Sequence, residues 1–282
     1  MKGKRGEQGY AMVAVVASIS VFAMLSGAIV AATRGSVVTA RAESDQAQAA
    51  AAADAGIALA LHGLLSTDPA YRWSIDGRQR KQTYGDAQLI IRIEDERGKV
   101  PISLIDEGQL TRLLEEIGLS GSRLRLARDS FMDWVDDDDD PRPDGAERAY
   151  YRPSGFAPRN GSLLTIDELA RVRGFDAALV ERLRPAITVN YGSGPFDARY
   201  ANPLALGIML EGGADSPLAI QRKRELAGQV TAIELESQAD IVGKPLSIIV
   251  EASLANGART RRTEIVELTG SEARPYVVRS YE

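Results

Sequence analysis

The chain has 282 residues, of which 44% are hydrophobic and 26% are charged, and both values are ordinary for a globular protein. Its formal net charge of −5 argues against nucleic acid as the main partner, because binding to nucleic acid favours a clustered basic face. There is no cysteine, so disulfides and thiolate metal sites are excluded. The single histidine, His62, cannot form a histidine cluster and is expected on a helix surface.

An uncharged apolar stretch, Tyr10–Ala32, follows directly after a short basic leader. As a helix its 23 residues would extend roughly 34 Å, which is enough to cross the ~30 Å hydrocarbon layer of a bilayer. Lys2, Lys4 and Arg5 precede it, and basic residues in this position keep a short N-terminus on the cytoplasmic side. The sequence therefore predicts a single-pass anchor, with the rest of the chain on the far side of the membrane.

The junction between Gly9 and Tyr10 resembles the site at which prepilin peptidase removes a leader, because a basic segment ends in glycine and the apolar run starts at once. An ordinary secretory signal is one alternative. Its apolar region spans only about 7–15 residues before a small-x-small cleavage site, whereas the best such site here, 40–42, lies far downstream. A plain signal anchor without cleavage is the other alternative.

The helix is predicted to continue to Leu65, since residues 49–53 are all strong helix formers and no proline occurs before Pro69. Ile57 and Leu61 mark one apolar face near its end, which is expected to pack against a soluble domain. Asp76-Gly77 reads as a hairpin-type turn.

The remaining chain alternates between blocks of strand and helix patterns. Strand composition occurs in residues 87–94, 229–236, 246–254, 261–268 and 276–281, with an Asn256-Gly257 turn in the last block. Helical spacing occurs in residues 110–117, with Gly118 as C-cap, and in residues 124–135, 177–183 and 202–210. Thr165 followed by Glu168 predicts a capping box that starts one more helix. This order predicts an α+β domain with an inserted helical block.

Nine acidic residues and only one base, Arg142, lie between Asp129 and Glu147. Five of the acids match the ligand offsets 1, 3, 5, 9 and 12 of an EF-hand loop: Asp136, Asp138, Asp140, Asp144 and Glu147. Pro141 stands at offset 6, where an EF-hand needs glycine, so the segment is not an EF-hand. Clustered carboxylates still favour a calcium ion, which binds 6–8 oxygens. The alternative is a solvated acidic loop without a metal.

Neither DNA binding nor catalysis is favoured by the rest of the sequence. Residues 167–183 follow a helix, glycine, helix pattern centred on Gly174, which is like a DNA-binding helix-hairpin-helix, but its acidic neighbourhood favours a packing role. No catalytic residue is predicted, because no grouping of serine, cysteine or histidine supplies a nucleophile and its base.

The chain resembles the minor pseudopilin K family (general secretion pathway protein K) of bacterial type II secretion systems. The shared segments run in family order from residue 9 to about 190. They are Gly9-Tyr10 with its apolar run, residues 95–99, residues 133–138, residues 141–147 with Tyr150-Tyr151, and residues 167–175. Arg148 departs from the pattern, since the family usually has an acidic residue there.

The resemblance implies an α+β pseudopilin fold with a long N-terminal transmembrane helix, an antiparallel β-sheet and a large inserted α-helical domain. The expected divisions are the leader (1–9), the transmembrane and spine helix (10–66), the first part of the β-domain (67–102), the helical insert with the acidic loop (103–212) and the C-terminal sheet (213–282). It also implies calcium ligation, carried over to Asp133, Asp136, Asp138 and Glu147.

The function implied by the resemblance is that of a non-enzymatic tip subunit, which initiates or caps a periplasmic pseudopilus that exports folded proteins. The implied partners are prepilin peptidase, the major pseudopilin and minor pseudopilins I and J, with the anchor in the inner membrane and the soluble region in the periplasm. Ala14 fits a tip position, because major pilins carry glutamate at this fifth residue after cleavage. The alternatives are a signal-anchored periplasmic binding module and a minor pilin of a type IV pilus or DNA-uptake system.

Overall fold

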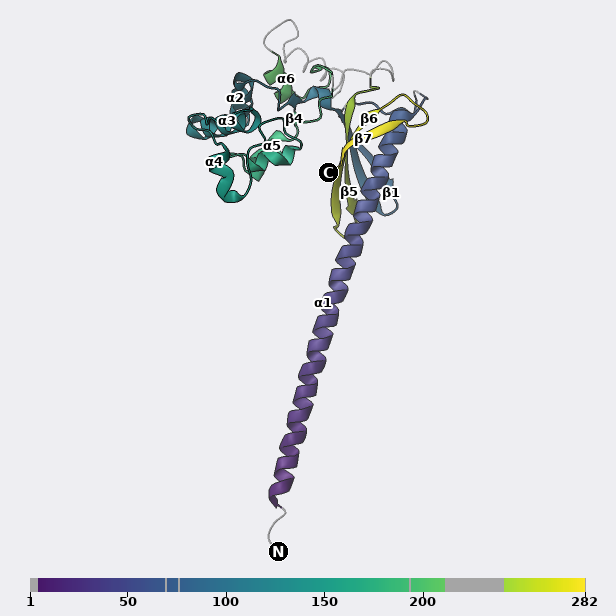
Figure 1. Ribbon diagram of the computed structural model, residues 1–282. Helices are drawn as coiled ribbons and strands as arrows, with labels where there is room; N and C mark the ends of the chain where they lie inside the picture. Colours follow the sequence, from purple (N-terminus) through teal and green to yellow (C-terminus); the bar gives the residue numbers. More distant parts are fainter. Residues whose placement is uncertain (1–4, 69, 76, 193, 211–240, 282) are drawn as a thin grey trace.

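The computed structural model describes the chain except for residues 1–4, 69, 76, 193, 211–240 and 282 (Figure 1). The described elements are α1 (Arg5–Leu65), β1 (Arg80–Tyr84), β2 (Ala87–Asp95), η1 (Glu96–Gly98), β3 (Val100–Pro101), α2 (Glu107–Glu116), α3 (Gly121–Val135), α4 (Arg148–Tyr151), η2 (Arg152–Ser154), η3 (Ile166–Arg171), α5 (Ala177–Leu183), β4 (Ile187–Thr188), α6 (Pro203–Met209), β5 (Pro245–Leu254), β6 (Arg259–Leu268) and β7 (Tyr276–Tyr281), where η marks a 3₁₀ helix. This combination of helices with an antiparallel sheet confirms the predicted α+β class.

Helix α1 is one continuous rod whose surroundings change along its length. Its first half projects away from the rest of the molecule in Figure 1. Every side chain from Met12 to Ala28 is exposed, Phe22 by 69% and Met24 by 78%. A run of exposed apolar side chains is stable in an apolar solvent and costly in water. The first half of α1 therefore has the character of a single-pass membrane anchor.

The second half of α1 is the spine of the soluble part. Ser36–Leu65 is also apolar enough to cross a membrane, but 50% of its most apolar window is buried inside the protein. Ala53, Ile57 and Leu64 face the sheet, and at Gly56 an added Cβ would lie 2.6 Å from Val250 Cγ1. Small residues let the helix and the sheet approach closely, so this segment is a core helix. His62 lies on its exposed side, as predicted.

Within the described residues the sheet has five strands in the order β1-β2-β5-β6-β7, all antiparallel. Side chains of β2 alternate between the two faces, and Leu89, Ile91 and Ile93 are buried against the core shared with α1, which confirms the predicted strand and its face. The strands predicted in residues 246–254, 261–268 and 276–281 are confirmed as β5, β6 and β7. The strand predicted in residues 229–236 lies outside the described residues.

Turn chemistry was predicted correctly at one hairpin and missed at another. Between β5 and β6, Gly257 has φ +93°, and Leu254 N donates to Ala258 O over 2.9 Å, as the Asn-Gly pair predicted. The first hairpin turns at Gly85, with φ +56°, between β1 and β2. Strand β1 was not predicted, because its sequence is polar throughout and it lies at the sheet edge. Of the Asp76-Gly77 pair, Asp76 lies outside the described residues.

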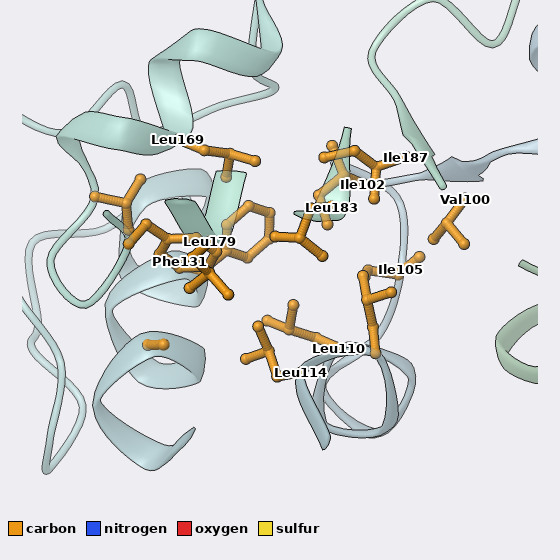
Figure 2. Close-up of a cluster of buried hydrophobic side chains, with 14 of the residues drawn as sticks. Val100, Ile102, Ile105, Leu110, Leu114, Phe131, Leu169, Leu179, Leu183 and Ile187 are labelled. Carbon is orange, nitrogen blue, oxygen red and sulfur yellow. The ribbon is translucent and has the colours of Figure 1, made fainter. Parts of the chain in front are cut away.

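A helical insert runs from β3 to α6 and has a hydrophobic core separate from that of α1 and the sheet. In Figure 2 the side chains of Leu110, Leu114, Phe131 and Leu179 converge from helices α2, α3 and α5. Strands β3 and β4 form a short parallel pair beside them. Residues Val100–Pro101, which the sequence analysis placed with the first part of the β-domain, belong to this pair in the insert.

A buried polar network joins the insert to the sheet. Glu96 is 2% exposed; one of its carboxylate oxygens accepts from Lys99 Nζ over 2.6 Å and from the Ser247 hydroxyl in β5, and the other accepts from the Thr188 hydroxyl in β4. At Gly98 an added Cβ would lie 2.4 Å from the carbonyl carbon of Tyr200. Residues 95–99 thus fix where the insert begins, a role that the sequence analysis missed.

The capping box predicted at Thr165 and Glu168 is wrong. Residues Ile166–Arg171 form the 3₁₀ helix η3, and the Thr165 side chain makes no capping hydrogen bond. Glu168 is buried and accepts instead from Trp134 Nε1 over 3.0 Å and from Arg159 Nε over 2.6 Å. A buried indole N–H requires a hydrogen-bond acceptor. The hydrogen bond between Trp134 and Glu168 therefore takes precedence over a capping box between Thr165 and Glu168. A true capping box occurs at Asp106, which caps α2 together with Gln109.

Candidate metal centre

The acidic loop connects the end of α3 to the start of α4. Helix α3 ends at Val135, and Asp136 is its C-cap in an extended conformation. Five successive aspartates repel one another, and Pro141 and Pro143 lack the N–H that a helix requires, so the chain leaves the helix and turns back. The turn brings Glu147, the residue before α4, back beside the start of the loop.

Three of the predicted ligands converge. One carboxylate oxygen each from Asp136, Asp138 and Glu147 lie within 4.8 Å of one another. Among the described residues, this is the one cluster of three such groups close enough to share a metal ion. The local sequence makes it possible, because the loop supplies two of the carboxylates and the return at Gly145 supplies the third.

Several oxygens of this cluster are buried without a hydrogen-bond donor. Glu147 is 4% exposed, and neither of its carboxylate oxygens accepts a hydrogen bond. Asp136 Oδ1 is likewise buried and unpaired. Burial, followed by the charges of Asp133 and Asp136, raises the pKa of Glu147 to about 7. Buried carboxylate oxygens without a partner are costly, so the arrangement fits a cation that would satisfy them.

The other three predicted ligands lie outside this cluster. Asp133 is fully buried and pairs with Arg142, whose Nη1 lies 2.8 Å from its Oδ1. Asp144 pairs with Arg125 across 3.0 Å. Asp140 is exposed, and its backbone N–H donates to Asp138 Oδ1 over 2.9 Å. Metal ligation by these three residues remains a prediction.

Residues from outside the loop hold its conformation. Asn160 Nδ2 donates to Asp138 O over 2.7 Å, and Arg173 Nη1 donates to Gly145 O over 2.9 Å. At Gly145 an added Cβ would lie 2.0 Å from Asp133 Oδ2, so only glycine fits. Asn160 has a left-handed backbone conformation with φ of 51°, which asparagine adopts more readily than most residues. The sequence analysis missed its role, because spacing along the chain does not show that Asn160 contacts the acidic loop.

The helix-glycine-helix segment, residues 167–183, packs against helix α3. Gly174 has φ +91°, and an added Cβ would lie 2.6 Å from Leu126 Cδ2 of α3. Val172, Phe175 and Leu179 are buried in the insert core. The segment thus uses its glycine turn for close packing on α3, in the way that the sequence analysis favoured.

The donor set is suited to a hard divalent cation. All the converging atoms are carboxylate oxygens, which calcium accepts in flexible numbers and geometries, whereas zinc in structural sites prefers nitrogen and sulfur. A calcium ion bound there would join α3 to α4 and neutralise the buried carboxylate of Glu147 together with those of Asp136 and Asp138. On this geometry such an ion would have a structural role.

Known proteins resemble this chain in sequence and in fold. The family profile described as "Type II secretion system (T2SS), protein K" matches residues 93–191. A "Type II secretion system protein K" of Klebsiella pneumoniae is 31% identical over 43% of this chain and 41% of that protein. One of Dickeya chrysanthemi is 35% identical over 28% of this chain and 22% of that protein. The alignments thus span less than half of these relatives.

The fold also matches a solved structure. The crystal structure of the GspK-GspI-GspJ complex from the type 2 secretion system of enterotoxigenic Escherichia coli contains a chain with a TM-score of 0.57 to this one. The match covers 86% of this chain and 98% of that chain, at 16% sequence identity. At this identity the likeness concerns the fold alone.

Proposed function

From its similarity to type II secretion system protein K over residues 93–191, we propose that this chain is a minor pseudopilin that initiates or caps a periplasmic pseudopilus. One observation carries the proposal. The segment that matches the family, 93–191, lies mainly in the helical insert, and the sheet beside the insert packs on α1, whose first half is exposed and apolar. A membrane holds such a helix before assembly, and neighbouring helices hold it within a filament. The insert is bulky and stands apart from α1 in Figure 1, which suits the end of a filament.

The proposed location is the inner membrane, with the sheet and the insert in the periplasm. Support comes from the exposed apolar stretch Met12–Ala28 and from the basic residues that precede it. The proposed partners are minor pseudopilins I and J in a tip complex, the major pseudopilin below them, and prepilin peptidase. The role is structural, as expected for a filament subunit.

A calcium ion at the acidic loop is the second part of the proposal. Asp136, Asp138 and Glu147 would hold it, because their oxygens converge and those of Glu147 have no other partner. The ion would keep α3 and α4 together and make the shape of the insert depend on extracytoplasmic calcium. Extracellular calcium modules bind with Kd values of about 10⁻⁴ to 10⁻³ M, which sets the range expected here.

Reconstitution tests the partner assignment. We expect the full chain in detergent to co-purify with minor pseudopilins I and J as one complex, with the major pseudopilin as a weaker partner. A complex with neither I nor J would return the chain to the first alternative, a signal-anchored binding module. Salt-sensitive binding to DNA, measured in the same preparation, would instead favour the DNA-uptake pilin.

Ala14 provides a test of the tip position. A glutamate at this place can pair with the N-terminal amine of a neighbouring subunit, but a subunit with none above it would leave that carboxylate unpaired in lipid, at a cost of about several kcal/mol. We therefore expect Ala14→Glu to weaken tip assembly or to give no gain, while Ala14→Ser leaves it unchanged. Secretion assays and recovery of the tip complex would measure this. Wild-type protein found along the filament shaft would contradict the tip assignment.

A further inference from the structure

Arg142 places a guanidinium inside the acidic loop. Its Nη1 lies 2.8 Å from Asp133 Oδ1 and 2.5 Å from Asp136 Oδ2. Its backbone N–H also faces Asp133, with nitrogen-to-oxygen distances of 3.3 and 3.2 Å. The Asp133 side chain is fully buried and that of Arg142 is 32% exposed, so the pair is only partly screened by water.

Asp136 faces two ways. Its Oδ2 binds Arg142, while its Oδ1 is buried and accepts no hydrogen bond. The two oxygens of Glu147 are also buried and unpaired, and this residue converges with Asp136 and Asp138. The loop is thus divided into one half that a protein cation already neutralises and another half that has no counter-charge.

We propose that Arg142 is a built-in cation that fills the Asp133 side of the loop, shares Asp136 with the bound metal and thereby sets the affinity for it. The inference rests on the cation site proposed above. It assigns Asp133 as the partner of Arg142 and leaves the metal to Asp136, Asp138 and Glu147. The loop then takes a single divalent ion.

Charge supports this division. Asp133, Asp136, Asp138 and Glu147 carry four negative charges when ionised, and Arg142 cancels one of them before any metal binds. Among the ion pairs of the described residues, Arg142 provides the only ones to these four carboxylates. Arg148 contacts Asp139 instead, across 3.6 Å, and its side chain is 66% exposed.

Two consequences follow for the metal. The guanidinium repels a divalent ion held on the other side of Asp136, so it weakens binding. It also keeps Asp133 paired when calcium is scarce, which limits the charge repulsion that would otherwise open the loop. Arg142 therefore lowers the affinity for calcium, and it also stabilises the folded loop when no calcium is bound.

Calcium titration of the full chain in detergent tests the inference, with calcium chloride as the probe and calorimetry as the readout. We expect one calcium per wild-type chain. Arg142→Gln should bind calcium at least about tenfold more tightly, a change equivalent to ~1.4 kcal/mol. Arg148→Gln, which removes an exposed arginine beside the same loop, is the matched control and should change the affinity by less than about threefold, or ~0.7 kcal/mol.

Asp133→Asn separates the two carboxylates. We expect it to retain one calcium per chain, whereas Asp136→Asn should lose calcium binding. If Arg142→Gln does not fold in chelator, it can be purified with calcium, and its release of calcium to a chelator should be slower than that of the wild type by about the same tenfold factor.

The outcomes are distinguishable. Unchanged or weaker calcium binding by Arg142→Gln, or loss of binding in Asp133→Asn, would overturn the role given to Arg142 while leaving the cation site in place. Absence of calcium binding in the wild type would overturn the proposed cation site itself, and the inference with it.

Discussion

Calcium at about 10 mM, which is roughly a hundredfold excess over a Kd of about 10⁻⁴ M, is expected to raise the melting temperature of the full chain in detergent by roughly 5–10 °C relative to chelator. A ligand that binds only the folded state stabilises it by about 2.7 kcal/mol at a hundredfold excess over Kd, and a chain of this size gains about 2–4 °C per kcal/mol. The effect is large because the ion would satisfy oxygens of Asp136 and Glu147 that are buried without partners. Differential scanning calorimetry or fluorescence would measure it.

Glu147→Gln should separate the stability of the chain in chelator from the stabilisation that calcium adds. The amide keeps the shape of the side chain but removes a buried charge that lies close to Asp133 and Asp136, so the variant is expected to melt in chelator at or above the wild-type temperature. It should gain little from calcium, because a principal ligand is lost. A destabilising substitution of an ordinary buried residue would lower both melting temperatures together.

Asp137→Asn is the matched control. Asp137 lies in the same aspartate run but is exposed and is not part of the converging cluster, so the variant should keep the full calcium increment. Magnesium should replace calcium poorly, since it requires near-ideal octahedral geometry and gives up its water reluctantly. Equal melting of the wild type in calcium and in chelator would identify the aspartate run as a solvated loop.

Regular elements were predictable where a local pattern decides them. The alternation in β2 follows from burial of one sheet face, and the helical spacing of Leu110, Leu113 and Leu114 follows from burial of one helix face. Failures occurred where a tertiary contact outweighed local preference. Glu168 serves the indole of Trp134 instead of capping a helix, and β1 is stabilised by pairing with β2 in spite of its polar sequence.

The candidate site was only partly predictable for the same reason. Spacing along the chain located the acidic loop, but it could not separate the oxygens that converge from those engaged by arginines. Arg125 and Arg142 bind Asp144 and Asp133, and these pairings depend on how α3 and the loop fold back on each other. Asn160 supports the loop from a position 22 residues beyond Asp138, a distance over which sequence spacing carries no information.

The second large effect is expected at the leader. Helix α1 begins at Arg5 and runs without interruption through Gly9 and Tyr10, so the bond that prepilin peptidase would cut lies within a helix of the uncleaved chain. Glycine weakens a helix by about 1 kcal/mol relative to alanine, and it presents no side chain to an enzyme that must reach the backbone. Gly9 would thus favour local unwinding of α1 and access of the peptidase to the backbone at this junction.

Gly9→Leu should therefore leave the leader attached and abolish secretion. Leucine strengthens the helix across the bond and adds a branched side chain at the place where the peptidase acts. The basic residues Lys2, Lys4 and Arg5 would stay covalently joined to α1, and they would hold the N-terminus at the cytoplasmic face and oppose its extraction into a filament. Gel mobility and N-terminal sequencing of the membrane form, together with a secretion assay, would measure the result.

Gly27→Leu is the matched control, because it makes the same substitution in the same helix at a position where an added Cβ meets nothing within 4 Å. Its processing should be normal, and its mature form should begin at Tyr10. The wild type should show the same new N-terminus, which neither a plain signal anchor nor a secretory signal cut near residues 40–42 would give. Processing of Gly9→Leu at the wild-type rate would show that the junction is not the cleavage site, and the assignment of α1 as a pseudopilin helix would then rest on its exposed apolar surface alone.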